Sequence, residues 1–299
     1  MMSLKIRTGS SVRGVYRRSK PTSSRRVCKI EGETESGKAE GTGVRAIEER
    51  FGTYMDEHPA VFRFEKWLQI YAGKHPSAFY GLYRLARKDR ARVVTPDTQL
   101  VIEGFPRSAN TFARVAFNRA QSERVRIAHG LHVPAQVIRA STWRIPTLVL
   151  IRKPKDAVLS FAIRDPISVD QALRYYISFY ETSEKYRDAY VLGLFEEVTE
   201  DFGQVIRRMN DKFGTTFSLF RHDEENVSKL FAGMEAQARK KYGQRLWERK
   251  VQRPAAVRER IKDEIEHDLE NPKQKGLIAR AEAVYDRLTN PMREPAPGK

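Results

Sequence analysis

The sequence predicts an α/β fold in which a parallel β-sheet is flanked by helices, with helical additions at the N- and C-terminal ends. Between about residues 98 and 213, short apolar runs alternate with segments of helical periodicity, as is typical of parallel sheets covered on both faces. One of these runs, Thr147–Ile151, is apolar after its first residue, as expected of a fully buried strand. Another run leads through a tight turn into a helix, an arrangement that can bind anions.

The individual elements follow from the same patterns. Strands are expected at Gln99–Glu103, Val125–Ala128, Thr147–Ile151 and Tyr190–Phe195. Helices are expected near Asn110–Ala120, Ala135–Ala140, Lys155–Ile163, Val169–Tyr186 and Asp201–Phe213, the last of them ended by Gly214. Apolar residues at helical spacing between 44 and 85 predict a helical lead-in. Residues 223–270 predict mostly helix with breaks near Gly243 and Pro254, and residues 277–288 predict a last amphipathic helix.

Composition divides the chain into three parts. Residues 1–43 have no apolar period and carry nine basic residues before the first acidic one, Glu31, so we expect a disordered basic tail. A nucleic-acid arm, a tether to anionic membranes and a transit peptide are the alternatives for this tail. Residues 44–290 are expected to form a single α/β domain, and the proline-containing stretch 291–299 a loose C-terminal tail.

Charge and cysteine content limit the classes of function. The net charge of the 299-residue chain is +17, and the share of it outside the tail fits a protein whose ligand is a polyanion. The single cysteine, Cys28, excludes an internal disulfide and is compatible with a reducing compartment, so we expect a cytoplasmic protein. No apolar run approaches the length of a transmembrane span, and the oligomeric state is not predicted.

The loop Gly104–Thr111 carries the clearest chemical signal. It lies between a strand and a helix, where the unpaired N–H groups of the helix N-terminus attract anions. Its spacing matches the nucleotide-binding P-loop, G-x-x-x-x-G-K-[ST], so the predicted sheet is P-loop-like. Ala109 replaces the second glycine and would resist a positive φ. Asn110 replaces the lysine that bridges two phosphoryl groups of ATP, which indicates a nucleotide whose transferred group is not a γ-phosphate.

A second candidate anion site follows the Thr147–Ile151 strand. Arg152 lies at the carboxyl end of this strand, where α/β sheets bind ligands. Ser160 lies about two turns into the next helix if that helix begins near Pro154. A guanidinium can grip a phosphate through two hydrogen bonds, and a serine hydroxyl can donate to the same group. The alternative is a plain helix start with a solvated Arg152 and Asp156 as a capping residue.

Both segments resemble the PAPS-dependent sulfotransferase family, where PAPS is 3′-phosphoadenosine 5′-phosphosulfate. The loop reads Pro106-Arg107-Ser108-Ala109-Asn110-Thr111-Phe112 where the family has roughly P-[KR]-S-G-T-T. Arg152, Asp156 and Ser160 have the spacing of the family's R-x-x-x-D-x-x-x-S pattern. The resemblance spans about 98–290 and implies sulfuryl transfer from PAPS to the hydroxyl of a small-molecule, glycan or lipid acceptor, without a metal.

The resemblance also implies roles for individual residues. The 5′ end of PAPS would be bound by Arg107, Ser108, Ala109, Asn110, Thr111 and Phe112. Its 3′-phosphate would be bound by Arg152 and Ser160. Phe195 falls where the family stacks an aromatic ring on adenine, although a buried core Phe is at least as consistent with the pattern. Lys275 and Gly276 match the end of the family's R-K-G element, with Gln274 in place of its arginine.

Sulfuryl transfer to an alcohol requires a proton acceptor, and a neutral imidazole suits this role near pH 7. His129 and His132 both follow the Val125–Ala128 strand. In the family a catalytic histidine follows the corresponding strand in a T-H-x-P context. His132 matches the H-x-P part, whereas His129 matches the position at the strand end and is slightly favoured. Arg107 would stabilise the negative charge that develops on the sulfuryl oxygens.

Two other functions compete with this interpretation. A P-loop ATP-dependent kinase is favoured by Thr111, which could bind Mg²⁺, and is opposed by Asn110 and by the lack of a clear strand ending in a metal-binding Asp. A basic nucleic-acid-binding protein is favoured by the net charge of +17. Because the predicted domain lacks interleaved basic and aromatic residues, we expect no nucleic-acid partner.

The acceptor pocket is expected to include part of residues 164–180. This segment carries several aromatic residues that could face a sugar or a hydrophobic alcohol, and core packing explains them equally well: Tyr175, Tyr176, Phe179 and Tyr180.

Overall fold

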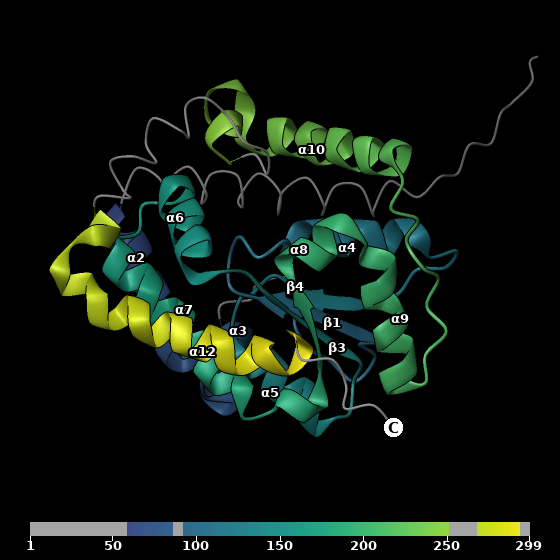
Figure 1. Cartoon of the computed structure of the whole chain (residues 1–299), viewed down its shortest axis with the longest axis horizontal. Coiled ribbons are helices and arrows are strands. Elements are labelled where there is room, and N and C mark those ends of the chain that lie inside the picture. Colours follow the sequence, from purple (N-terminus) through teal and green to yellow (C-terminus); the bar gives the residue numbers. More distant parts are fainter. Residues whose placement is uncertain (1–58, 86–91, 251–267, 294–299) are drawn as a thin grey trace, which may run out of the picture. The chain divides into compact units, whose positions relative to one another are not determined.

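The computed structural model describes residues 59–85, 92–250 and 268–293. Within them, four parallel strands form a sheet in the order β2-β1-β3-β4, flanked by helices (Figure 1). The strands are β1 (Leu100–Gly104), β2 (Ile127–His129), β3 (Thr147–Ile151) and β4 (Val191–Leu194). The predicted α/β fold with a parallel sheet is therefore confirmed. The predicted basic tail and the predicted break near Pro254 lie outside the described residues.

The helices also follow the predicted order. Two precede the sheet, α2 (Pro59–Ala72) and α3 (Pro76–Leu85). Those within the α/β region are α4 (Asn110–Ala120), α5 (Pro134–Thr142), α6 (Pro154–Arg164), α7 (Val169–Glu184), α8 (Phe195–Glu200) and α9 (Phe202–Phe213). They are followed by α10 (Glu224–Lys250) and α12 (Lys275–Arg293), and the 3-10 turns Arg187–Ala189 and Pro272–Gln274 lie before β4 and α12. Gly214 ends α9 at a φ of 65°, as predicted.

The break predicted near Gly243 is wrong, because α10 runs through this residue. A glycine inside a helix costs only about 1 kcal/mol relative to alanine. The good helix formers around Gly243, among them Arg239, Gln244 and Leu246, offset that cost.

Strand β3 separates two hydrophobic cores. Val149 and Ile151 pack with residues of α6, α7 and α12. Leu148 and Leu150 point to the other face and pack with residues of α4 and α9. Because successive side chains of a strand alternate between its faces, a strand covered on both sides must be apolar throughout. This burial accounts for the apolar run that identified β3 in the sequence.

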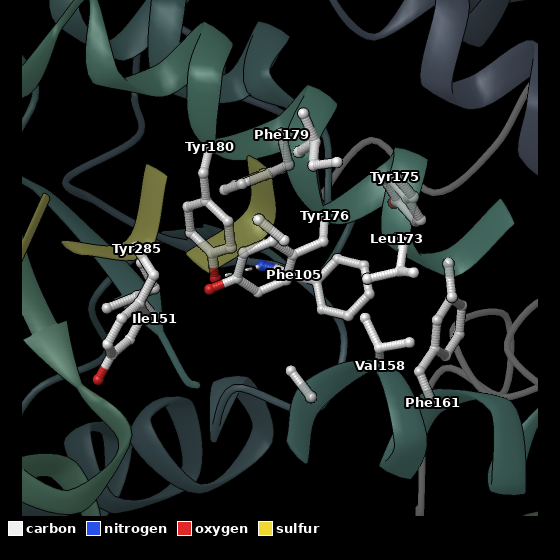
Figure 2. Packing of buried hydrophobic residues seen from close by; sticks show 14 of the residues in the cluster. Phe105, Ile151, Val158, Phe161, Leu173, Tyr175, Tyr176, Phe179, Tyr180 and Tyr285 are labelled. Carbon is white, nitrogen blue, oxygen red and sulfur yellow. Dashed lines mark hydrogen bonds between the residues drawn. The ribbon is translucent and has the colours of Figure 1, made fainter. Parts of the chain in front are cut away.

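The turn after β1 is anchored in a cluster of aromatic side chains (Figure 2). The ring of Phe105 lies 5.5 Å from Phe161, 5.4 Å from Tyr175 and 5.2 Å from Tyr176, centroid to centroid, in edge-on contacts. Its backbone N–H donates to the Tyr180 hydroxyl at 3.2 Å, the bond dashed in Figure 2. These contacts fix the point at which the chain enters the loop Gly104–Thr111, which we call the anion loop.

The aromatic residues of α7 belong to the core rather than to an acceptor pocket. Tyr175, Tyr176, Phe179 and Tyr180 are each at most 1% exposed. The tyrosine hydroxyls donate to backbone carbonyls at the sheet edge, at 2.7 Å each: Tyr175 to His132, Tyr176 to Arg152 and Tyr180 to Leu150. Of the two explanations that the sequence left open for this segment, core packing is therefore the correct one. Through these hydrogen bonds, the aromatic residues hold the backbone of the site in place.

Gly104 permits a close approach of β1 to β3. A Cβ atom at this position would lie 2.4 Å from the Leu150 carbonyl oxygen. We expect Gly104→Ala to lower the free energy of unfolding by about 3 kcal/mol, because the Leu150 backbone that the added atom would meet is held in β3 and leaves little room for relaxation. The matched control is Gly81→Ala in α3, where nothing lies within 4 Å of the added atom and about 1 kcal/mol should be gained. Urea denaturation of both variants measures the difference; equal stabilities would contradict this account.

Candidate functional site

The carboxyl ends of the four parallel strands lie at one edge of the sheet. The anion loop follows β1, His129 ends β2, Arg152 follows β3 and Phe195 follows β4. In parallel α/β sheets, ligands bind at this edge because the loops there converge. The structure thus brings together all the site residues predicted from the sequence between 104 and 195.

The loop adopts a backbone conformation suited to anions. Arg107 and Ala109 both have positive φ, 71° and 66°. Alternation of left- and right-handed residues turns successive N–H groups toward one point and forms a concave anion-binding nest. Ala109 is the N-cap residue of α4, and no side chain caps this helix. The alanine that was expected to resist a positive φ therefore adopts it, at a strain of about 1–2 kcal/mol.

Two polar side chains of the loop hold its shape. The Asn110 side-chain amide donates to the Phe105 carbonyl at 2.9 Å. Ser108 is fully buried, its N–H donates to the same carbonyl at 3.3 Å, and its hydroxyl lies 3.4 Å from that of Tyr180. Asn110 thus fastens the loop at the position where a P-loop lysine would contact a nucleotide.

Phe112 lies in the core, with its ring stacked on His222 at 5.8 Å. Only the backbone of Phe112 is thereby left for a ligand. The Thr111 side chain is half-buried at the start of α4.

Arg107, Ser160 and Arg152 meet between β1 and β3. The Arg107 side chain is 9% exposed, and its Nε donates to the Ser160 hydroxyl at 2.8 Å. Arg152 Nη1 lies 3.5 Å from the Arg107 carbonyl oxygen. As predicted, α6 begins at Pro154, which places Ser160 two turns into the helix. The Arg152 guanidinium therefore lies next to the Arg107 backbone, at the carboxyl edge of β1 and β3.

Arg152 is also held by its aromatic neighbours. Its guanidinium lies over the ring of Phe195, 4.2 Å from the centroid. Burial lowers the pKa of Arg152, while the carboxylates of Asp156 and Glu196 act in the opposite direction. Its Nε is buried and has no hydrogen-bond partner among the described residues. One face of the half-buried Phe195 ring is therefore covered by a cation.

The geometry of His132 fixes which of its ring nitrogens can accept a proton. Its Nδ1 lies 2.7 Å from the Gly104 carbonyl oxygen. A carbonyl only accepts, so Nδ1 carries the hydrogen and Nε2 is left as the acceptor of the neutral ring. His132 itself has a positive φ of 57°. Its carbonyl oxygen accepts from Tyr175, so the backbone of this residue is fixed as well.

Both histidines are neutral at pH 7. Burial lowers the pKa of His129 to about 3, and the positive charges of Arg114 and Arg92 add to this effect. Burial also lowers the pKa of His132 to about 3, assisted by Arg164, Lys66 and Arg92 and opposed by the bond to Gly104. The surroundings of both rings are therefore positively charged.

Glu103 is a residue of the site to which the sequence analysis gave no role. It is fully buried, and its carboxylate accepts from the N–H groups of Leu131 at 3.0 Å and of His132 at 2.9 Å. Burial raises the pKa of Glu103 to about 7, although these hydrogen bonds and Arg92 lower it. The carboxylate thus holds the turn that carries His132. An acidic residue within an otherwise apolar strand was the sequence signal for it.

These shifts predict a specific dependence of stability on pH. The folded protein depresses the pKa of each histidine below its unfolded value, so stability present above pH 6.5 is lost as the pH falls. Glu103 has a raised pKa, so its contribution is present below pH 4.5 and is lost as the pH rises to about 7. Between pH 4.5 and 6.5, each group changes the slope of the free energy of unfolding against pH by about 1.4 kcal/mol per pH unit.

Urea denaturation at pH 4.5, 5.5 and 6.5 tests this with two variants. Relative to wild type, the stability of His132→Gln should rise less steeply with pH, and that of Glu103→Gln more steeply, each by about 1.4 kcal/mol per unit. If the free energy of unfolding changes with pH at the same slope in wild type and in both variants, the assigned pKa shifts are contradicted.

Lys275 and Gly276 lie at the exposed start of α12. Helix α12 packs on α6 and α7, and Lys155 of α6 pairs with Glu282 at 3.5 Å. This pair joins α12 to the first turn of the helix that carries Ser160. The contribution of Lys275 and Gly276 to a ligand site stays a prediction.

Two further properties of the described residues bear on the site. They contain no group of three or more His, Cys, Asp or Glu side chains that could hold a metal ion. No helix within the described ranges is long and apolar enough to cross a membrane.

No family model matches the chain, and no curated protein matches it. Among solved structures, it is similar to the crystal structure of mouse sulfotransferase SULT7A1 complexed with PAP, with a TM-score of 0.34 and 12% sequence identity. The match covers 64% of this chain and 91% of the mouse chain.

Proposed function

We propose that the protein is a sulfotransferase that moves a sulfuryl group from PAPS to the hydroxyl of an acceptor. The observation that supports this most strongly is the meeting of Arg107, Ser160 and Arg152 beside an uncapped helix N-terminus. Two guanidinium groups and a hydroxyl at the carboxyl edges of adjacent strands suit a ligand with more than one anionic group. The absence of a lysine at position 110 disfavours transfer of a γ-phosphate.

The residues present fit the two anionic ends of PAPS. The N–H groups at the start of α4 have no side-chain cap, and the loop turns toward them. Together with Arg107 they would hold the 5′ end. Arg152, whose buried Nε has no hydrogen-bond partner among the described residues, would hold the 3′-phosphate with Ser160. The half-buried ring of Phe195 would lie against the adenine. When bound, PAPS supplies the sulfuryl group.

The chain contributes positioning and charge stabilisation. Arg107 and the loop N–H groups would stabilise the negative charge that grows on the sulfuryl oxygens during transfer. Because these groups are already held by Ser160 and by the aromatic cluster, little reorganisation accompanies the reaction. Positioning of this kind supplies a large part of the rate in displacements between two bound groups.

His132 is the better candidate for the base, and we assign it that role in preference to His129. Its Nδ1–H bond to Gly104 leaves Nε2 to take the proton of the acceptor hydroxyl, and Gly104 begins the anion loop. The low pKa keeps the ring neutral, and its physical causes are burial and neighbouring cations. A bound polyanion offsets those cations and raises the pKa toward the range in which a base is effective.

Binding of 3′,5′-adenosine bisphosphate tests the proposal. In a thermal unfolding assay with EDTA present, a concentration one hundred times the Kd should stabilise the full chain by about 2.7 kcal/mol. AMP, which lacks the 3′-phosphate, is the matched control and should stabilise far less. If, in a parallel assay without EDTA, Mg·ATP stabilises the chain and 3′,5′-adenosine bisphosphate does not, the proposal is overturned in favour of a kinase. Tight, strongly salt-dependent binding of DNA without nucleotide binding would favour the nucleic-acid alternative.

A further inference from the structure

The side of the anion loop that faces β2 carries a cluster of polar groups that the proposed donor site does not use. Arg92 donates from Nη2 to the carbonyl of Gly130, directly after β2. His129 is the last residue of β2. Arg114 lies on α4, which packs against β2. All three residues are half-buried and so keep some contact with solvent.

The charge of this cluster is positive and incompletely balanced. Burial and the neighbouring charge of Arg92 lower the pKa of Arg114, and Arg114 and Arg92 in turn lower that of His129. The Nε of Arg92 is buried without a hydrogen-bond partner among the described residues. Glu103 acts on Arg92 electrostatically, but its carboxylate oxygens already accept from two backbone N–H groups. Like charges that gather around an unpaired donor are typical of a site that is completed by an anion.

The cluster adjoins the proposed base. His129 lies opposite Ile102 on the neighbouring strand, two residues before the start of the loop at Gly104. Arg114 comes one helical turn after Asn110, so the two share a face of α4 with about 6 Å between their Cβ atoms. Because β1 lies between β2 and β3, His129 at the end of β2 and Arg152 after β3 flank the loop that follows β1. In the proposed reaction, the acceptor hydroxyl and the sulfuryl group would meet at this loop.

We propose that Arg92, Arg114 and His129 form a subsite for an oxyanion carried by the acceptor, so that the acceptor is an anionic hydroxyl compound. The two guanidinium groups bind the carboxylate, sulfate or phosphate of this compound, and the neutral imidazole of His129 donates one N–H to it. The inference rests on the proposed function, since the subsite places the acceptor hydroxyl near His132. It gives His129 a role in acceptor binding rather than in proton transfer.

The test compares matched acceptors that differ only in the anionic group. The full chain, saturated with 3′,5′-adenosine bisphosphate, is titrated calorimetrically with glucose, glucuronate, glucose 6-sulfate and glucose 6-phosphate. At least one anionic sugar should bind at least tenfold more tightly than glucose, and the three arms show whether carboxylate, sulfate or phosphate fits best. In Arg114→Gln the ratio of the Kd of glucose to the Kd of the anionic sugar should fall close to one. Arg114→Lys should restore part of this ratio. The matched control is Arg119→Gln, an exposed residue of the same helix, which should keep the full preference.

Each outcome of these titrations supports or contradicts the proposed subsite. If no anionic sugar binds more tightly than glucose, or if Arg114→Gln leaves the preference unchanged, the inference is wrong. If Arg114→Gln weakens the nucleotide tenfold and leaves the sugars unaffected, Arg114 belongs to the donor site instead. Failure of the nucleotide to bind wild type would overturn the proposed function. The same sugar titrations without nucleotide would then still decide whether the cluster binds oxyanions.

Discussion

His132→Gln is expected to lower kcat by a factor of about 10²–10⁴ with PAPS and an alcohol acceptor, the range that a general base contributes. The glutamine removes the acceptor nitrogen that the Gly104 bond leaves available. The Kd of 3′,5′-adenosine bisphosphate should stay within about twofold of wild type, because His132 is not among the groups assigned to the donor. Steady-state kinetics and nucleotide titration measure the two quantities.

His129→Gln is the matched comparison, since His129 ends β2, His132 follows three residues later, and both have a depressed pKa. Its effect should be mainly on KM for the acceptor. A large loss of kcat in His129→Gln with little change in His132→Gln would reverse the assignment of the base. Nearly wild-type kcat in both variants would remove a histidine base from the mechanism.

Arg107→Ala and Arg152→Ala are expected to lower kcat/KM about a hundredfold each, which corresponds to a loss of about 3 kcal/mol of transition-state stabilisation. The two losses should differ in kind. Arg107 acts where charge develops during transfer, so its removal should lower kcat. Arg152 holds the 3′-phosphate in both the ground state and the transition state, so its removal should weaken binding of 3′,5′-adenosine bisphosphate and raise KM for PAPS.

The control for this pair is Lys153→Ala, which removes an exposed positive charge next to Arg152. It should leave kcat and KM within about twofold of wild type. Thermal unfolding of each variant separates a binding defect from unfolding, because Arg107 also bonds Ser160 and its loss alters packing. If Arg107→Ala and Arg152→Ala both retain nearly wild-type activity, the donor site is wrongly placed.

The strands and helices near the site could be predicted because their signals are local. Helix α4 has the bounds expected of it, and β3 coincides with its apolar run. In both cases the hydrophobic periodicity and the turn residues that bound the element lie within a few residues of one another. The end of β2 was predicted less well, because the strand is short and its one-residue extension to His129 depends on pairing with β1.

Contacts between distant segments had no local signal. The bond between Arg107 and Ser160 joins the loop after β1 to the second turn of α6, and only the parallel pairing of β1 and β3 brings these segments together. The tyrosines of α7 were consistent with either a pocket or a core, and the packing of Phe105 among them decides for the core. The positive φ of Ala109 runs against its own preference, and the surrounding contacts impose it.

By itself, the sequence determined the α/β class, the order of its elements and the position of an anion loop between β1 and α4, because these depend on residue spacing along the chain. The tertiary structure alone decided which nitrogen of His132 can accept a proton, that Glu103 holds the turn beneath it, and that Arg92 and Arg114 gather beside His129. Each of these depends on hydrogen bonds or charges between segments far apart in sequence. The strength of such interactions is set by distance and burial in the folded protein, and neither quantity is encoded in local spacing.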